Sequence, residues 1–144
     1  MASEPGQGSL SLEQIEHDAW GDPPNGATRL VRAAYELHRK PIAALTTEDL
    51  RLLIGQHIGV EVLLPYALAL LSDDPLAEGD MYPGDLLVAV LRLPPEYWPA
   101  HRGQAAELRR IAGVAKETDS IIQAGIDVIQ ASVGRFLAMT EQQT

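Results

Sequence analysis

Five side chains in the middle of the chain carry the ligand types of a metal-dependent hydrolase. The set comprises His57, Glu61, Asp80, Asp85 and His101. Carboxylate oxygens together with imidazole nitrogens suit a divalent metal ion. His57 and Glu61 lie one helical turn apart, but only if Gly59 between them does not end the helix. A hydrogen-bonded histidine at a helix end is the simpler interpretation, so a hydrolase remains an alternative hypothesis.

Other catalytic patterns do not occur in the sequence. It has no glycine-rich phosphate loop, serine elbow, HExxH motif or paired metal-ligand motif. It also has no cysteine, which excludes disulfides, thiolate zinc sites and cysteine nucleophiles and fits a reducing compartment. His17, His38 and His101 lie among charged or turn residues, where we expect solvated side chains. Beyond the five residues above, the sequence therefore contains no catalytic pattern, and we expect no cofactor.

Acidic residues are concentrated in one part of the chain. The net charge is −9, which argues against sequence-independent binding to nucleic acid. Residues 41–91 contain eight acids and Arg51 as their one Lys or Arg. Five of these acids share residues 73–85 with two prolines and two glycines, a composition that predicts a loop; they are Asp73, Asp74, Glu78, Asp80 and Asp85. Such a local field attracts a basic partner, although acidic runs also serve solubility alone.

Aromatic residues add candidate anchors for a protein partner. Tyr82 lies within the acidic stretch, Trp20 precedes a turn at residues 21–26, and a proline-rich connector at residues 94–103 presents Tyr97 and Trp98. Trp and Tyr carry much of the energy at protein interfaces. The alternative is that these four rings belong to the core or cover it.

Helical periodicity accounts for most of the remaining chain. We expect helices over residues 11–20, 28–40, 46–55, 60–71, 83–91, 104–115 and 118–139, with N-caps at Ser11 and at Thr46 or Thr47. No confident strand pattern appears. The sequence predicts a disordered tail at residues 1–10 and a single all-α domain at residues 11–144, an orthogonal array of about six to eight helices. Breaks within residues 52–72 argue against a membrane span, and the N-terminus does not resemble a signal peptide.

Two of these helices are expected in the core, and a third carries an apolar seam. Residues 86–91 are apolar on every side, and residues 60–71 nearly so, which makes the latter the expected central helix. The seam comprises Ile122, Ile126, Ile129, Val133 and Phe136. If it docks on its own domain, the protein is a monomer when free. If it is exposed, the chain is instead a structural or regulatory adaptor that pairs with another helix.

Three blocks of sequence resemble a known family. The blocks LSLEQIEHDAW with GDPP, RKPIAALTTEDLRLLIGQHIG and DPLAEGDMYPGDLLVAVLRL are similar, in this order, to immunity proteins of bacterial contact-dependent growth inhibition systems, over roughly residues 11–98. The resemblance implies a small cytoplasmic protein that is not an enzyme and neutralises a toxin domain delivered by a neighbouring cell. It further implies that the toxin is encoded immediately upstream. Many such toxins are nucleases with basic clefts, which an acidic surface can block.

Overall fold

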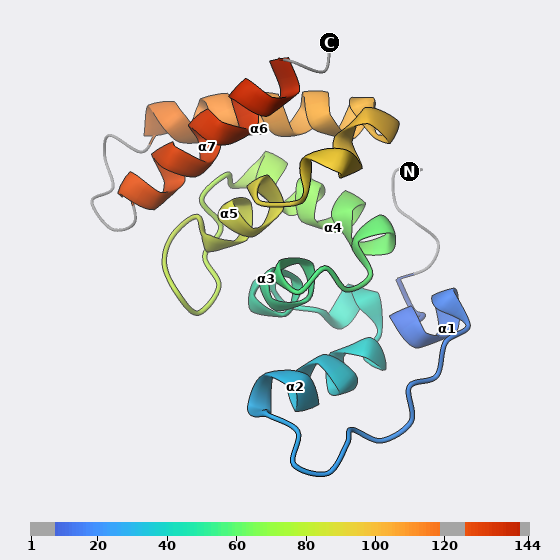
Figure 1. Cartoon of the computed structure of the whole chain (residues 1–144). Coiled ribbons are helices and arrows are strands. Elements are labelled where there is room, and N and C mark those ends of the chain that lie inside the picture. The colour runs from blue at the N-terminus through green and yellow to red at the C-terminus, as the bar shows by residue number, and fades with distance from the viewer. Residues whose placement is uncertain (1–7, 119–125, 142–144) are drawn as a thin grey trace.

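The computed structural model describes residues 8–118 and 126–141 (Figure 1). Within these ranges the chain forms seven α-helices, two short 3₁₀ helices and no strand, which confirms the predicted all-α fold. The elements are α1 (Leu12–Glu16), α2 (Arg29–His38), η1 (Ile42–Ala44), α3 (Thr47–Gly55), α4 (Val60–Asp73), α5 (Asp85–Leu91), η2 (Pro95–Ala100), α6 (Arg102–Thr118) and α7 (Ile126–Glu141). No helix among the described residues is long and apolar enough to cross a membrane.

The helices form layers along the molecule. In Figure 1, α1 and α2 lie at one end, α6 and α7 lie side by side at the other, and α3, α4 and α5 lie between them. Two helices share the middle of the molecule: α5 packs against α3, α4 and α7, and α4 packs against α3, α5 and α6. Residues 60–71 thus lie in the core as expected, although they do so together with α5. Helix α4 buries one face and leaves Pro65, Ala69 and Leu70 exposed, since apolar side chains are common on protein surfaces.

Helix ends follow the local sequence closely. Ser11 and Thr46 each form a capping box, in which the side chain of the N-cap residue accepts a backbone hydrogen bond and the residue at N3 bonds back. Helix α1 ends at Glu16, earlier than expected, because His17 adopts a left-handed conformation with φ of +54°. The carbonyl groups of Gly8 and Leu10 accept hydrogen bonds from the amides of Ala43 and Ile42, so the chain is paired from residue 8. Residues 1–7 lie outside the described residues.

The apolar core extends through α5 to the C-terminal helix. Residues 86–91 are buried apart from the half-buried Ala89, as predicted. Val133 and Phe136 of α7 are also buried, and the Phe136 ring lies edge-on to Trp98 with centroids 5.4 Å apart. The described part of the seam thus docks on its own domain. Ile122 lies outside the described residues, as do the side chains of Ile126 and Ile129.

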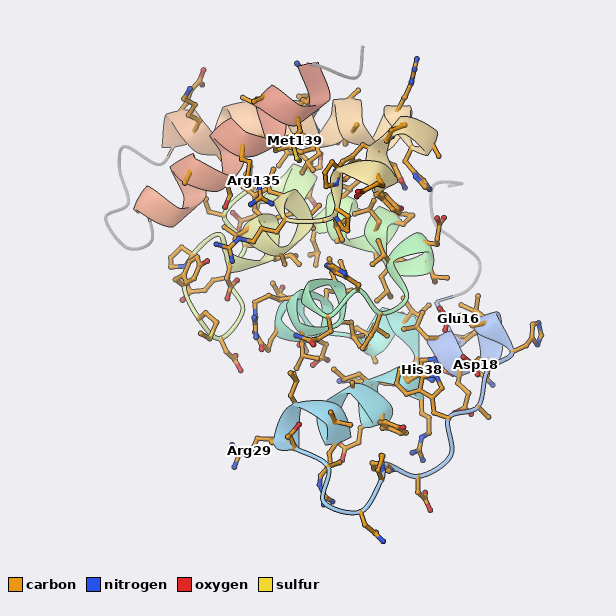
Figure 2. The ribbon with its side chains drawn as sticks, in the orientation of Figure 1. Glu16, Asp18, Arg29, His38, Arg135 and Met139 are labelled. Carbon is orange, nitrogen blue, oxygen red and sulfur yellow. The ribbon has the colours of Figure 1, made fainter. Side chains whose placement is uncertain are left out.

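The N-terminal segment is attached to α2 through a buried histidine. The His38 ring is fully buried, stacks on Trp20 with centroids 3.8 Å apart, and places Nε2 3.1 Å from Glu16 Oε1. Figure 2 shows Glu16, Asp18 and His38 gathered at this junction. The expectation that His38 is solvated is therefore wrong, because the chain folds back after α1 and covers the end of α2. Trp20 serves this attachment and is only partly exposed.

Candidate functional site

The acidic stretch, residues 73–85, forms a compact loop between α4 and α5, which we call the acidic loop. Its first turn is closed by a hydrogen bond from the Ala77 amide to the Asp74 carbonyl. Its two ends are joined by a bond of 3.1 Å from the Gly84 amide to the Leu76 carbonyl, beside a bridge between Glu78 and Pro83. Leu76 and Ala77 are buried and fix the base of the loop in the core. The loop therefore has a defined shape.

Asp85 holds the interior of this loop. Its Oδ1 accepts a hydrogen bond of 2.7 Å from the Gly79 amide, and its Oδ2 accepts bonds of 2.9 Å from Met81 and 3.3 Å from Tyr82. Only 4% of the residue is exposed. Asp85 was expected among the surface acids, and the structure corrects that placement. A carboxylate at the start of α5 instead satisfies loop amides that have no backbone partner of their own.

A second attachment comes from α3. Glu48 Oε1 accepts hydrogen bonds from the Asp80 amide at 2.8 Å and from Arg51 Nε at 2.7 Å. The hydrogen bond from Arg51 lowers the pKa of Glu48 below its ordinary value. Arg51 Nε also lies 3.8 Å from Asp85 Oδ2. Gly79 makes this approach possible, because a Cβ there would lie 2.6 Å from Glu48 Oε1 and 3.2 Å from Glu48 Cα.

The fold divides the eight acids of residues 41–91 into two groups of four. One group is bonded within the protein: Glu48 to Arg51, Asp49 to Lys40, Glu61 to His101, and Asp85 to the loop amides. The other group is exposed on the acidic loop and makes no ion pair among the described residues; it comprises Asp73, Asp74, Glu78 and Asp80. Met81, which is 64% exposed, follows Asp80 on the same loop, and Tyr82 is half-buried beside it. The unneutralised charge of this region therefore lies on one hydrogen-bonded loop that also exposes an apolar side chain.

The other aromatic candidates lie elsewhere. Trp98 is 1% exposed, so the expectation that the connector presents it at the surface is wrong. The ring fills the core against Phe136. Tyr97 is half-buried in η2 and stacks on His101, and its burial raises its pKa to about 12. Neither Tyr97 nor Trp20 stacks on a residue of the acidic loop.

The residues of the hypothetical metal site are distributed over several places. His101 is half-buried rather than fully solvated; its Nδ1 donates to the Tyr97 carbonyl at 2.7 Å, and its Nε2 lies 3.1 Å from Glu61 Oε2. The acceptor at Tyr97, and then Glu61, raise the pKa of His101. Asp85 is occupied by loop amides, and the exposed His57 lines a pocket next to α5. In the part of the chain that the structure describes, no three His, Asp or Glu residues are grouped so that they could hold a metal ion.

The fold and the loop together define a class of protein. The chain is a small helical protein that displays a rigid, unneutralised acidic surface, as proteins that associate with basic partners do. The family model of the CDI immunity proteins matches residues 14–108, which is more than half of the chain. The chain therefore belongs to the CDI immunity proteins, and the resemblance seen in its sequence blocks is confirmed. The match includes the acidic loop and the pocket next to it. No curated protein and no solved structure matches the chain.

Proposed function

We propose that this CDI immunity protein neutralises a toxin domain with nuclease activity by placing the acidic loop against the toxin's basic nucleic-acid cleft. A nuclease cleft attracts phosphates with Lys and Arg side chains. The same side chains attract carboxylates, so a loop with four free acids competes for the same surface. The observation that carries this proposal is the division of the acids, which leaves Asp73, Asp74, Glu78 and Asp80 exposed and without an ion-pair partner among the described residues.

The rigidity of the loop favours this role. A loop that is ordered only on binding loses affinity to the entropy of ordering it. Asp85 and Glu48 already hold the amides of Gly79, Asp80 and Met81 in the free protein. The carboxylates are thereby presented in a fixed arrangement before the toxin arrives.

Met81 supplies an apolar centre for the same surface. Interfaces combine a desolvated anchor with a polar rim that excludes water. Met81 follows Asp80 in the acidic loop and is the most exposed large apolar side chain among the described residues. In the proposed complex it is buried in the toxin, while the carboxylates around it pair with basic residues. The free protein acts as a cytoplasmic monomer and contacts neither nucleic acid nor membrane.

The association rate tests this proposal. We would measure binding of the toxin domain encoded by the neighbouring gene at low and high salt, together with its nuclease activity. The triple variant Asp73→Lys, Asp74→Lys, Asp80→Lys should associate at least about tenfold more slowly at low salt, because opposite charges steer the encounter. The matched control, Asp22→Lys, Glu36→Lys, Glu96→Lys, changes the same charge at exposed sites outside the loop. It should keep inhibition and most of the wild-type rate.

Equal rates for the two triple variants, with full inhibition by both, would contradict the proposed contact. If the control associates more slowly than the loop variant, the interface lies instead at the surfaces near Trp20 or Tyr97, which adjoin Asp22 and Glu96 in the chain. If the wild-type protein binds and inhibits the toxin domain but that domain cleaves no nucleic acid, the nuclease part of the proposal is wrong.

A further inference from the structure

A pocket of about 330 Å³ lies next to the acidic loop, between the end of α3 and α5. Its lining includes Met81 and Tyr82 from the loop and three cationic or potentially cationic side chains, Arg51, His57 and Arg92. One carboxylate, Asp85, also borders it, but that group is buried and accepts three amide hydrogen bonds. The pocket therefore offers hydrogen-bond donors beside a loop whose free groups are acceptors.

His57 has no evident role in the fold. It occupies the position after the C-cap of α3, with φ of +60°, where glycine is the preferred residue. The bonds from its own amide to Ile54 and from the Ile58 amide to Leu53 complete the helix end, and glycine would make both equally well. Its exposed imidazole makes no hydrogen bond or ion pair among the described residues. Strained backbone positions are enriched at functional sites, and here the unused side chain borders a pocket.

Arg92 is the second unused donor. It is the C-cap of α5, its side chain is exposed, and it forms no ion pair within the described structure. Arg51, by contrast, also lines the pocket but is already bonded to Glu48. A planar guanidinium with free N–H groups binds carboxylates in a bidentate manner.

We propose that this pocket receives an acidic side chain of the toxin domain, which Arg92 and His57 bind while the acidic loop contacts basic residues around it. This inference rests on the proposed function and adds the identity of a second contact. Full binding then requires a toxin surface on which a carboxylate is flanked by basic residues. A partner that has basic residues alone would pair with the acidic loop but would leave the pocket unfilled, so it would bind more weakly. The pocket thus contributes specificity, and the loop contributes attraction over a longer distance.

The test uses the full chain and the toxin domain encoded beside it. His57→Gly removes the imidazole and relieves the backbone strain, and Arg92→Gln removes the charge. His17→Gly is the matched control, because His17 has the same left-handed conformation, at φ of +54°, at the end of α1. We expect His57→Gly to melt no lower than His17→Gly and Arg92→Gln to melt as the wild type does. Both pocket variants should dissociate from the toxin at least about tenfold faster than the wild type, with little change in association rate. His17→Gly should bind as the wild type does.

A scan of the toxin identifies the occupant. Each surface Asp of the toxin is changed to Asn and each Glu to Gln, and affinity is measured against the wild type and Arg92→Gln. At least one toxin variant should bind the wild-type immunity protein about tenfold more weakly, yet bind Arg92→Gln as well as the unchanged toxin does. This result would show coupling between that acidic residue of the toxin and Arg92. If the wild type binds and the pocket variants bind equally well, or if no acidic residue of the toxin couples to Arg92, the pocket proposal is overturned and the loop proposal stands. If the wild type does not bind the toxin, the proposed function itself fails.

Discussion

Removal of the Asp85 carboxylate should destabilise the protein through the acidic loop. In Asp85→Ala the amides of Gly79, Met81 and Tyr82 lose their acceptor. A hydrogen bond to a charged group contributes about 1.5 to 3 kcal/mol, and a buried donor left unpaired costs about as much. The bonds from Gly79 and Met81 are short, at 2.7 and 2.9 Å, whereas the bond from Tyr82 is 3.3 Å long and contributes less.

The size of the effect follows from these bonds and from access to water. Met81 is exposed, so its amide can bond to water once the carboxylate is gone. Arg51 retains its bonds to Glu48. If the bond from the Gly79 amide is lost in full and water partly replaces those from Met81 and Tyr82, the free energy of unfolding falls by about 3 kcal/mol. The matched control is Asp80→Ala, which removes the same charge from an exposed carboxylate of the same loop and should change stability by less than about 0.5 kcal/mol.

Chemical denaturation measures the difference, and amide hydrogen exchange locates it. We expect exchange at Gly79, Met81 and Tyr82 to accelerate in Asp85→Ala and to stay slow in Asp80→Ala. If Asp85→Ala unfolds within about 1 kcal/mol of Asp80→Ala, the loop is not held by Asp85, and the reasoning that it is shaped before binding is refuted.

Three further outcomes are expected. Leu87→Ala should cost about 2 to 5 kcal/mol in urea denaturation because the side chain is fully buried in α5, and a shift below about 1 kcal/mol would place the residue outside the core. Phe136→Ala should cost about 3 to 5 kcal/mol, and a monomeric, equally stable variant would show that α7 is an appendage. The Tyr97 carbonyl, and then Glu61, raise the pKa of His101 in the folded protein. Its contribution to stability is therefore complete below the ordinary pKa of 6.5 and is lost as pH rises through the pKa of the folded state. His101→Gln should therefore flatten the decline in unfolding free energy between about pH 6 and about pH 8, and an unchanged decline would assign it to other groups.

Local signals in the sequence predicted where the helices begin. The capping residues Ser11 and Thr46, and the position of Pro83 before α5, mark helix starts that the structure confirms within two residues. The uninterrupted apolar run of residues 86–91 correctly indicated burial. These features depend on neighbours along the chain, so no knowledge of the fold was needed to see them.

Burial of single polar and aromatic residues could not be predicted in the same way. Asp85 was placed with the surface acids because its partners become visible only when the loop folds back over it. The contact of Glu48 with the Asp80 amide joins residues that are 32 positions apart. His38 and Trp98 are covered by segments whose positions depend on packing of the whole chain. Gly79 carried the one available signal, since a glycine within an acidic loop often marks a close backbone approach.

The contact between the acidic loop and the toxin is tested most directly by oxidation footprinting of Met81. Oxidation of methionine depends on access to its sulfur, and 64% of Met81 is exposed in the free protein. Met139 in α7 is half-buried and provides an internal reference. We expect saturation with the toxin domain to slow oxidation of Met81 several-fold and to leave Met139 unchanged. Oxidation of Met81 at the free rate within a formed, inhibitory complex would contradict the central claim, because the loop would then lie outside the interface.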